Sequence, residues 1–176
     1  MGPMAHRTGP RSTRRSSKTT RWLDDEEETA WRAIAMAMTK LRWALESQLE
    51  RDADLSFIEY HVLARLSEEP NHTLRMSELA VLTNATLSRL SHLVKRLEAR
   101  GLIRREPDAS DGRFTNAILT DTGHAKLVAS APAHVETVRA LVIEAFSAAE
   151  LQQLRQASER MLARIEALPP SNSAAP

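Results

Sequence analysis

The chain has 176 residues, of which 42% are hydrophobic and 4% aromatic, and its formal net charge is +1. This length suggests one domain with extensions, and the absence of cysteine excludes disulfides, thiolate metal sites and cysteine nucleophiles. No apolar run approaches the roughly 18 residues of a membrane span, so we expect a cytoplasmic protein.

The charges are distributed unevenly along the chain. Residues 1–21 carry six Lys or Arg and no acid, and residues 83–105 carry six Lys or Arg against the single Glu98. Residues 1–22 are also rich in Ser, Thr, Gly and Pro, so we expect a disordered basic tail. It is either a merely solvated tail or an arm that adds nonspecific phosphate contacts, and the sequence leaves both readings open.

Residues 23–52 predict one long helix. Five consecutive acids, Asp24 to Glu28, fit a first helical turn because the helix dipole favours negative charge there. Apolar residues then recur at steps of three and four: Trp31, Ile34, Met38, Leu41, Leu45 and Leu49. Such a stripe needs a partner, either inside the chain or in a second copy.

Three shorter helices are predicted next. Residues 55–69 begin with Ser56 and Glu59 at capping-box spacing and end before Pro70. MSELAVLT (76–83) predicts a short helix, and a tight connection leads to a helix over about 85–100, with Thr83 or Asn84 as N-cap. Two helices joined in this way have the helix-turn-helix layout.

A hairpin is predicted after this pair. Gly101 closes the helix, and LIRRE (102–106) and RFTNAILT (113–120) read as two strands separated by the turn-rich PDASDG. A hairpin directly after a helix-turn-helix is called a wing.

Residues 121–168 predict two more helices, followed by a loose end over 169–176. The first is capped by Thr120 or Asp121, and Pro132 should kink or restart it. The second begins with a capping box of Ser147 and Glu150.

The helix over 85–100 has two contrasting faces. Leu87, Leu90, Val94 and Leu97 are spaced to form its buried face, and the opposite side gathers Ser88, Arg89, His92, Lys95 and Arg96. A helix that is merely solvated usually mixes both signs of charge, whereas this one contains a single acid. Short hydroxyls among cations suit close approach to phosphates and base edges. Together with the wing, this pattern favours contact with a nucleic acid.

Two segments in this order, LSFIEYHVLARLSEEP (55–70) and MSELAVLTNATLSRLSHLVKRLEARGLIRREPDASDGRFTNAILTDTG (76–123), resemble the MarR (multiple antibiotic resistance regulator) family. The similarity covers about residues 25–167. Its most specific pieces are TLSRLSHLVKRLEARGLIRR, the wing tip Asp111-Gly112-Arg113 and the exit Leu119-Thr120-x-x-Gly123.

The resemblance implies a mainly α fold with a small β-wing, in which a winged helix-turn-helix (residues 53–120) is set on a helical dimerisation domain (residues 23–52 and 121–168). It implies a nucleoid-associated homodimer that regulates transcription, a repressor rather than an activator, without a cofactor. The partner would be double-stranded DNA with a pseudo-palindromic operator, because the two recognition helices of a dimer lie roughly 34 Å apart.

We expect the DNA contacts on the helix over 85–100, in the first strand and at the wing tip. Arg89 is the expected base reader, and the resemblance makes Arg113 the wing-tip cation, held by Asp111. Gly112 stands where many relatives carry a second basic residue, so this wing has less charge. The full predicted set is Thr86, Ser88, Arg89, Ser91, His92, Lys95, Arg96, Arg104, Arg105, Asp111 and Arg113.

Members of the family often bind small aromatic or anionic effectors where the dimer helices meet the winged domain. Trp43, Tyr60 and His61 are the candidate lining residues, and packing in the core or dimer is the alternative role for them. Such a ligand would release the repressor from DNA.

Other function classes find little support. The six histidines lack the i,i+3 or i,i+4 spacing of a helical metal site, so we expect no metal. No nucleophile elbow, P-loop or dinucleotide motif occurs, so we expect no enzyme. Two alternatives stay open: a winged helix that contacts protein, whose basic stripe would be incidental, and a DNA-binding protein without an effector.

Overall fold

The computed structural model describes residues 20–168, so the predicted loose end lies outside the described residues, as does all but the last part of the predicted basic tail. The chain divides into two units, residues 1–36 and 37–176, and helix α1 (Asp25–Ala53) contributes to both. In the first unit, Asp24 Oδ1 accepts the Glu27 N–H at 2.9 Å and Glu27 Oε2 accepts the Asp24 N–H at 3.1 Å. These two bonds close the start of α1, within the run of acids that predicts a first helical turn there.

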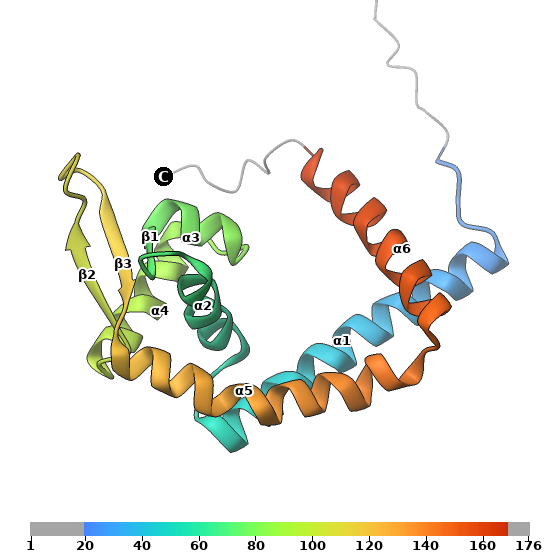
Figure 1. Ribbon diagram of the computed structural model, residues 1–176. Helices are drawn as coiled ribbons and strands as arrows, with labels where there is room; N and C mark the ends of the chain where they lie inside the picture. The colour runs from blue at the N-terminus through green and yellow to red at the C-terminus, as the bar shows by residue number, and fades with distance from the viewer. Residues whose placement is uncertain (1–19, 169–176) are drawn as a thin grey trace, which may run out of the picture. The chain divides into compact units, whose positions relative to one another are not determined.

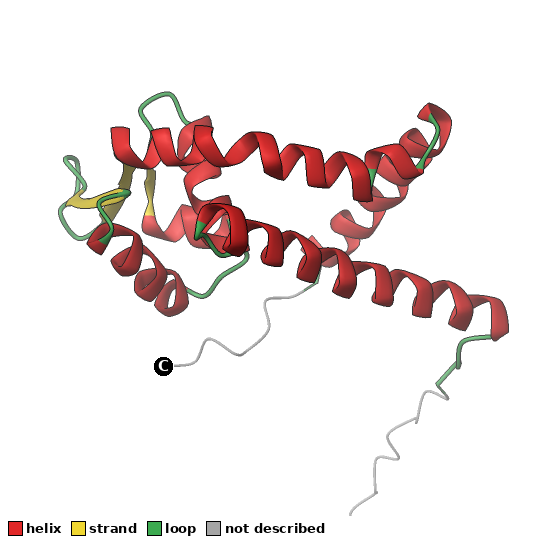
Figure 2. Ribbon diagram, turned by 90° about the horizontal axis from the view of Figure 1, so that it is seen from below, coloured by secondary structure: helices red, strands yellow, loops and turns green. Residues whose placement is uncertain are grey.

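The second unit continues α1 and adds a helical body with one small sheet (Figures 1 and 2). The prediction of a mainly α fold with a small β-wing is confirmed. In chain order the elements are α2 (Phe57–Glu68), β1 (Thr73–Arg75), α3 (Met76–Leu82), α4 (Leu87–Ala99), β2 (Ile103–Pro107), β3 (Thr115–Leu119), α5 (Asp121–Leu141), the 3-10 turn η1 (Ile143–Ala145) and α6 (Ala148–Glu166).

Local capping determines where several helices begin. Both bonds of the predicted capping box of α2 are present: the Ser56 N–H donates to Glu59 Oε2 at 2.9 Å and the Glu59 N–H donates to Ser56 Oγ at 3.3 Å. Ser147 and Glu150 begin α6 in the same way. These starts are readable from sequence because the partners are only three residues apart.

The predicted N-cap of α4 is wrong. Thr86, rather than Thr83 or Asn84, holds that position, and its Oγ1 accepts the Arg89 N–H at 3.2 Å. Thr83 ends α3, and Asn84 lies in the turn with φ +50°. Asparagine tolerates this left-handed backbone better than most residues, so it serves the turn while the next available hydroxyl caps the helix.

The three strands form an antiparallel sheet in the order β1-β3-β2. Leu74 of β1 and Arg105 of β2 lie on either side of Ala117 of β3. The hairpin of β2 and β3 is the predicted wing, but β1 was not predicted, because three residues are too few to show an alternating pattern. β1 joins the base of the wing to the segment just before α3.

The core of the second unit lies among α2, α3, α4 and the sheet. Leu63, Leu66, Leu90 and Leu97 are fully buried in it. Leu87, predicted on the buried face of α4, is instead 53% exposed. It is the first residue of the helix, and helical spacing alone cannot show where the core stops.

Helix α5 begins at a close approach to the end of α4. Thr120 is its N-cap, accepting the Gly123 N–H at 3.0 Å while its own hydroxyl donates to the Gly101 carbonyl at 2.7 Å. A Cβ at Gly123 would lie 2.0 Å from the Leu102 carbonyl oxygen, so no other residue fits without movement. Pro132 does not restart the helix, which is continuous from Asp121 to Leu141.

None of the described helices has the length and hydropathy that crossing a bilayer requires.

Replacing Gly123 by alanine is therefore expected to destabilise the fold by about 2–3 kcal/mol, the cost of overpacking a closed site. The free energy of unfolding in urea measures it. Gly112→Ala is the matched control, because a Cβ there would have nothing within 4 Å, and it should change stability by less than about 0.5 kcal/mol. Equal effects of the two substitutions would contradict the close approach.

Candidate nucleic-acid interface

The predicted polar face of α4 is exposed as a continuous surface. Ser88, Arg89, His92 and Lys95 are exposed and Ser91 is half-buried, while Leu90, Leu93, Val94 and Leu97 are buried on the opposite side. The structure thus brings these polar side chains onto one face. Thr86 is also exposed, but its hydroxyl serves as the helix cap.

Two cations of this face stand apart from the rest. Within residues 20–168, no ion pair involves Arg89 or Lys95. Their charges are available to an external anion without breaking an internal contact.

Arg96 is oriented differently. Its guanidinium lies 3.2 Å from Glu59 of α2, a carboxylate with only 8% of its side chain exposed, and Arg100 approaches the same carboxylate at 3.7 Å. A buried carboxylate needs such partners because burial disfavours its charge. Arg96 therefore links α4 to α2, and its role as a DNA contact stays a prediction.

The two arginines of β2 are also paired within the chain. Arg104 forms an ion pair with Glu106, and Arg105 Nη2 lies 2.6 Å from Glu98 Oε2. Hydrogen bonds from Arg105 lower the pKa of Glu98, so this carboxylate stays ionised. Both pairs are partly exposed, and an approaching phosphate would compete with a carboxylate at each.

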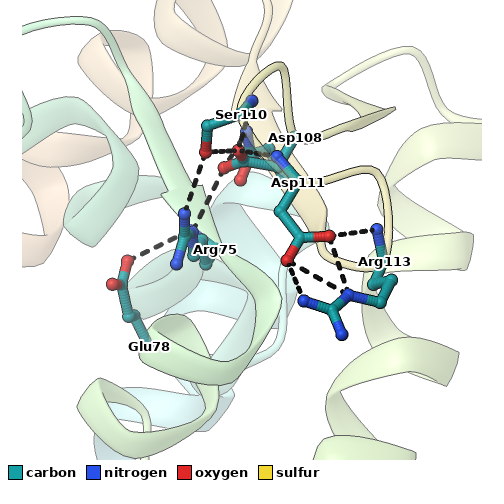
Figure 3. Close-up of polar contacts among 7 residues, drawn as sticks. Arg75, Glu78, Asp108, Ser110, Asp111 and Arg113 are labelled. Carbon is teal, nitrogen blue, oxygen red and sulfur yellow. Dashed lines mark hydrogen bonds and ion pairs between the residues drawn. The ribbon is translucent and has the colours of Figure 1, made fainter.

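The wing tip carries the predicted pair of Asp111 and Arg113 (Figure 3). Arg113 Nη2 lies 2.6 Å from Asp111 Oδ2, and the Arg113 N–H donates to Asp111 Oδ1 at 3.1 Å. The guanidinium lowers the pKa of Asp111, and the carboxylate raises that of Arg113. With 86% of its side chain exposed, Arg113 is held by its neighbour and still presented outward.

A shallow pocket with a volume of about 210 Å³ lies between α4 and the wing. Its lining comes from the end of β1, from the starts of α3 and α4, from β2 and from the wing loop with the start of β3, and consists of Arg75, Met76, Ser77, Leu87, Ser91, Arg105, Arg113, Phe114 and Thr115. The predicted contacts Ser91, Arg105 and Arg113 therefore meet at one place. Arg75, which no sequence pattern indicated, joins them because β1 pairs with β3.

A second cluster lies where α1, α2 and α5 meet. The buried His134 of α5 has Nδ1 3.2 Å from Gln48 Oε1 of α1 and its ring 4.5 Å from that of Tyr60. His61 follows Tyr60 on α2, and the centres of their two rings are 6.2 Å apart. Trp43 is 71% exposed, so packing in this chain's own core does not account for it. The described residues contain no group of three or more His, Asp or Glu side chains that could hold a metal.

Comparison with known proteins extends these observations. The MarR family model matches residues 53–113. The chain is 38% identical over 80 residues to the transcriptional regulator HosA of Escherichia coli, a match that covers 45% of this chain and 57% of HosA. It is 28% identical over 107 residues to the transcriptional repressor MprA of the same species, covering 61% of this chain and 60% of MprA. The matches thus span less than two thirds of these curated relatives.

Two solved structures from Streptomyces coelicolor resemble the chain over most of its length. Sco3205, a MarR family transcriptional regulator solved in complex with DNA, is 42% identical with a TM-score of 0.79, covering 89% of this chain and 97% of that one. AbsC, a MarR family transcriptional regulator, is 36% identical with a TM-score of 0.81, covering 85% and 100%.

The surroundings of His134 predict a pH-dependent stability. Burial, and then the nearby His61, lower the pKa of His134 below its ordinary value of 6.5, so the unfolded chain binds the proton more readily. Stability should therefore be complete above about pH 6.5 and fall as the pH decreases below it. Urea unfolding between about pH 5 and pH 8 measures this, and His134→Gln should flatten the slope. An unchanged slope in that variant would refute the assignment.

Proposed function

Because this chain belongs to the MarR family of transcriptional regulators, we propose that it is a homodimeric repressor that binds an operator in double-stranded DNA and is released by a small-molecule effector. The observation that carries DNA binding is the exposed face of α4, where Arg89 and Lys95 have no ion pair within residues 20–168. Cations without internal partners can neutralise phosphates at little cost.

The proposed DNA contacts are of two kinds, contacts to base edges and contacts to backbone phosphates. A recognition helix reads bases mainly with its N-terminal residues, so Arg89, beside Ser88 and Thr86, is the proposed base reader. An arginine can donate two hydrogen bonds to the major-groove edge of guanine. Lys95, six residues further along, is the proposed phosphate contact, with Ser91 and His92 between them. Arg104 and Arg105 would exchange their carboxylates for backbone phosphates.

The wing supplies the second proposed contact. Arg113 is exposed and held by Asp111, which suits insertion into a minor groove, where negative potential is strongest when the groove is narrow. The complex of Sco3205 with DNA supports the proposal, since that protein is 42% identical to this chain.

The proposed dimer follows from apolar surface that the single chain leaves uncovered. None of the described residues of α6 is buried, and Met161, Leu162 and Ile165 are 43%, 54% and 61% exposed. Val135 and Leu141 of α5 are exposed as well. A second copy is the proposed cover, because a two-fold dimer pairs the same surface from both chains. Two α4 helices would then read two half-sites of a pseudo-palindrome.

The proposed effector site is the junction of α1, α2 and α5. Tyr60 and His61 would contribute to it together with His134 and Gln48, which lie in contact there, while Trp43 would take part from the exposed side of α1. An effector that binds the DNA-incompetent state twentyfold better supplies about 1.8 kcal/mol of coupling. The similarity to MprA, named a transcriptional repressor, supports repression rather than activation.

Retention on duplex DNA as a function of salt tests the DNA proposal. About six phosphate contacts should give a slope near −5 when the logarithm of the binding constant is plotted against the logarithm of the salt concentration.

Arg89→Ala should reduce the preference for a selected duplex over random DNA, by about 1–3 kcal/mol, whereas Lys95→Ala should weaken binding to both duplexes about equally. Retention that does not change with salt would instead favour a winged helix that contacts protein.

Sedimentation velocity tests the dimer. Ile165→Asp places a charge in the proposed interface, so the dissociation constant should rise at least about tenfold, while the fold of each chain persists because the residue is exposed. Gln152→Asp adds the same charge to an exposed polar position of α6 and should leave the dimer intact. A wild-type chain that sediments as a monomer at micromolar concentration would reject the proposal.

A further inference from the structure

We propose that Arg75 and Asp108 form a latch that fixes the wing tip against the start of α3, so that Arg113 meets DNA in a defined position. The latch means these two side chains together. The inference rests on the DNA binding proposed above, and it makes both residues positioning residues of the wing.

Arg75 is held at the joint between β1 and α3. Its backbone N–H donates to Glu78 Oε2 at 3.3 Å, and its Nε donates to Asp108 Oδ2 at 3.1 Å. The guanidinium also lies 4.8 Å from the centre of the Phe114 ring. The side chain therefore spans from the helix-turn-helix to both ends of the wing loop, and only 37% of it is exposed.

Asp108 organises the loop from the other end. Its Oδ1 accepts the backbone N–H groups of Ser110 at 2.9 Å and of Asp111 at 3.2 Å, and its Oδ2 accepts Asn116 Nδ2 at 3.3 Å besides Arg75. Only 12% of the side chain is exposed. Hydrogen bonds from Ser110, and then those from Arg75 and Asn116, hold its pKa well below the ordinary value, so the carboxylate stays ionised at neutral pH.

These contacts form a continuous path to the wing-tip cation (Figure 3). Arg75 holds Asp108, Asp108 binds the N–H of Asp111, and Asp111 holds Arg113 at 2.6 Å. Backbone bonds from the Asp108 N–H to the Phe114 carbonyl at 2.9 Å, and from the Phe114 N–H to the Asp111 carbonyl at 3.0 Å, close the loop. The position of Arg113 thus depends on a side chain 38 positions earlier in the sequence.

The latch and plain electrostatics predict opposite effects of one substitution. Removing a carboxylate near a polyanion should strengthen binding if charge alone matters, because one repulsion is lost. The latch predicts weaker binding, since a neutral side chain at 108 holds Arg75 and the loop less firmly and Arg113 loses its defined position.

The test measures the affinity of Asp108→Asn for a duplex that the wild-type chain selects from a random pool, over a range of salt. We expect binding about tenfold weaker than that of the wild type, with the salt slope reduced by about 1 although no cation has been removed. Arg75→Lys should show a similar loss, because lysine keeps the charge but not the planar fork that spans Asp108 and Phe114. The double variant of Arg75→Gln and Asp108→Asn should bind no more weakly than either single variant.

Several outcomes would overturn the latch. The first is that Asp108→Asn binds DNA as tightly as the wild type or more tightly. The second is that Arg75→Lys keeps full affinity for DNA while Arg75→Gln binds weakly. The third is that the losses of DNA affinity of Arg75→Gln and Asp108→Asn multiply in the double variant. Arg65→Gln removes a partly exposed arginine paired with Glu68 on α2 and serves as the matched control, expected to bind normally. If Asp108→Asn fails to fold, Arg75→Lys carries the test. A wild-type chain that selects no duplex would reject DNA binding itself, a result distinct from failure of the latch.

Discussion

The presentation of α4 depends on the burial of one side of the helix. Leu90, Val94 and Leu97 are 0% exposed, packed in the core shared by α2, α3 and the sheet. Because these leucines and valine recur every three or four residues, burying them turns Arg89 and Lys95 outward. Rotating the helix would bury an unpaired cation, which costs far more than any gain in apolar contact. The core therefore fixes the face that the proposed function uses.

Ion pairing within the chain then separates two kinds of basic residue. Arg96 and Arg105 are paired with Glu59 and Glu98, so they connect α4 to α2 and to β2 respectively. Arg89 and Lys95 have no such pair within residues 20–168 and remain available. A count of cations along the sequence treats all four alike. With Arg100 and Arg104, which are also paired, four of the six cations of residues 83–105 have a carboxylate partner within the chain, so their charge is not simply free to meet phosphate.

The junction of α1, α2 and α5 gives the proposed regulation a physical basis. His134 contacts Gln48 of α1 and Tyr60 of α2. A ligand here would therefore touch α2 of the winged domain as well as α5, which the proposed dimer uses. α5 leads from this junction to α6, whose apolar residues are exposed. A small movement at the junction would therefore reach the proposed dimer interface and the winged domain together. Coupling of this kind requires only that the ligand favour one arrangement over the other.

Sequence alone determined most of the features whose causes are local, the N-cap of α4 being the exception. The caps at Ser56 and Ser147 follow from partners three residues away, and the alternation of apolar and basic positions specified α4 and its polar side. The pair of Asp111 and Arg113 was expected from the resemblance to the MarR family, and the structure contains it. Only tertiary structure decided the rest. β1 forms because β3 is available to pair with it, Arg96 turns toward Glu59 because that carboxylate is buried, and Arg75 reaches Asp108 across the sheet. These contacts join residues that lie more than thirty positions apart, and no local pattern encodes such a pairing.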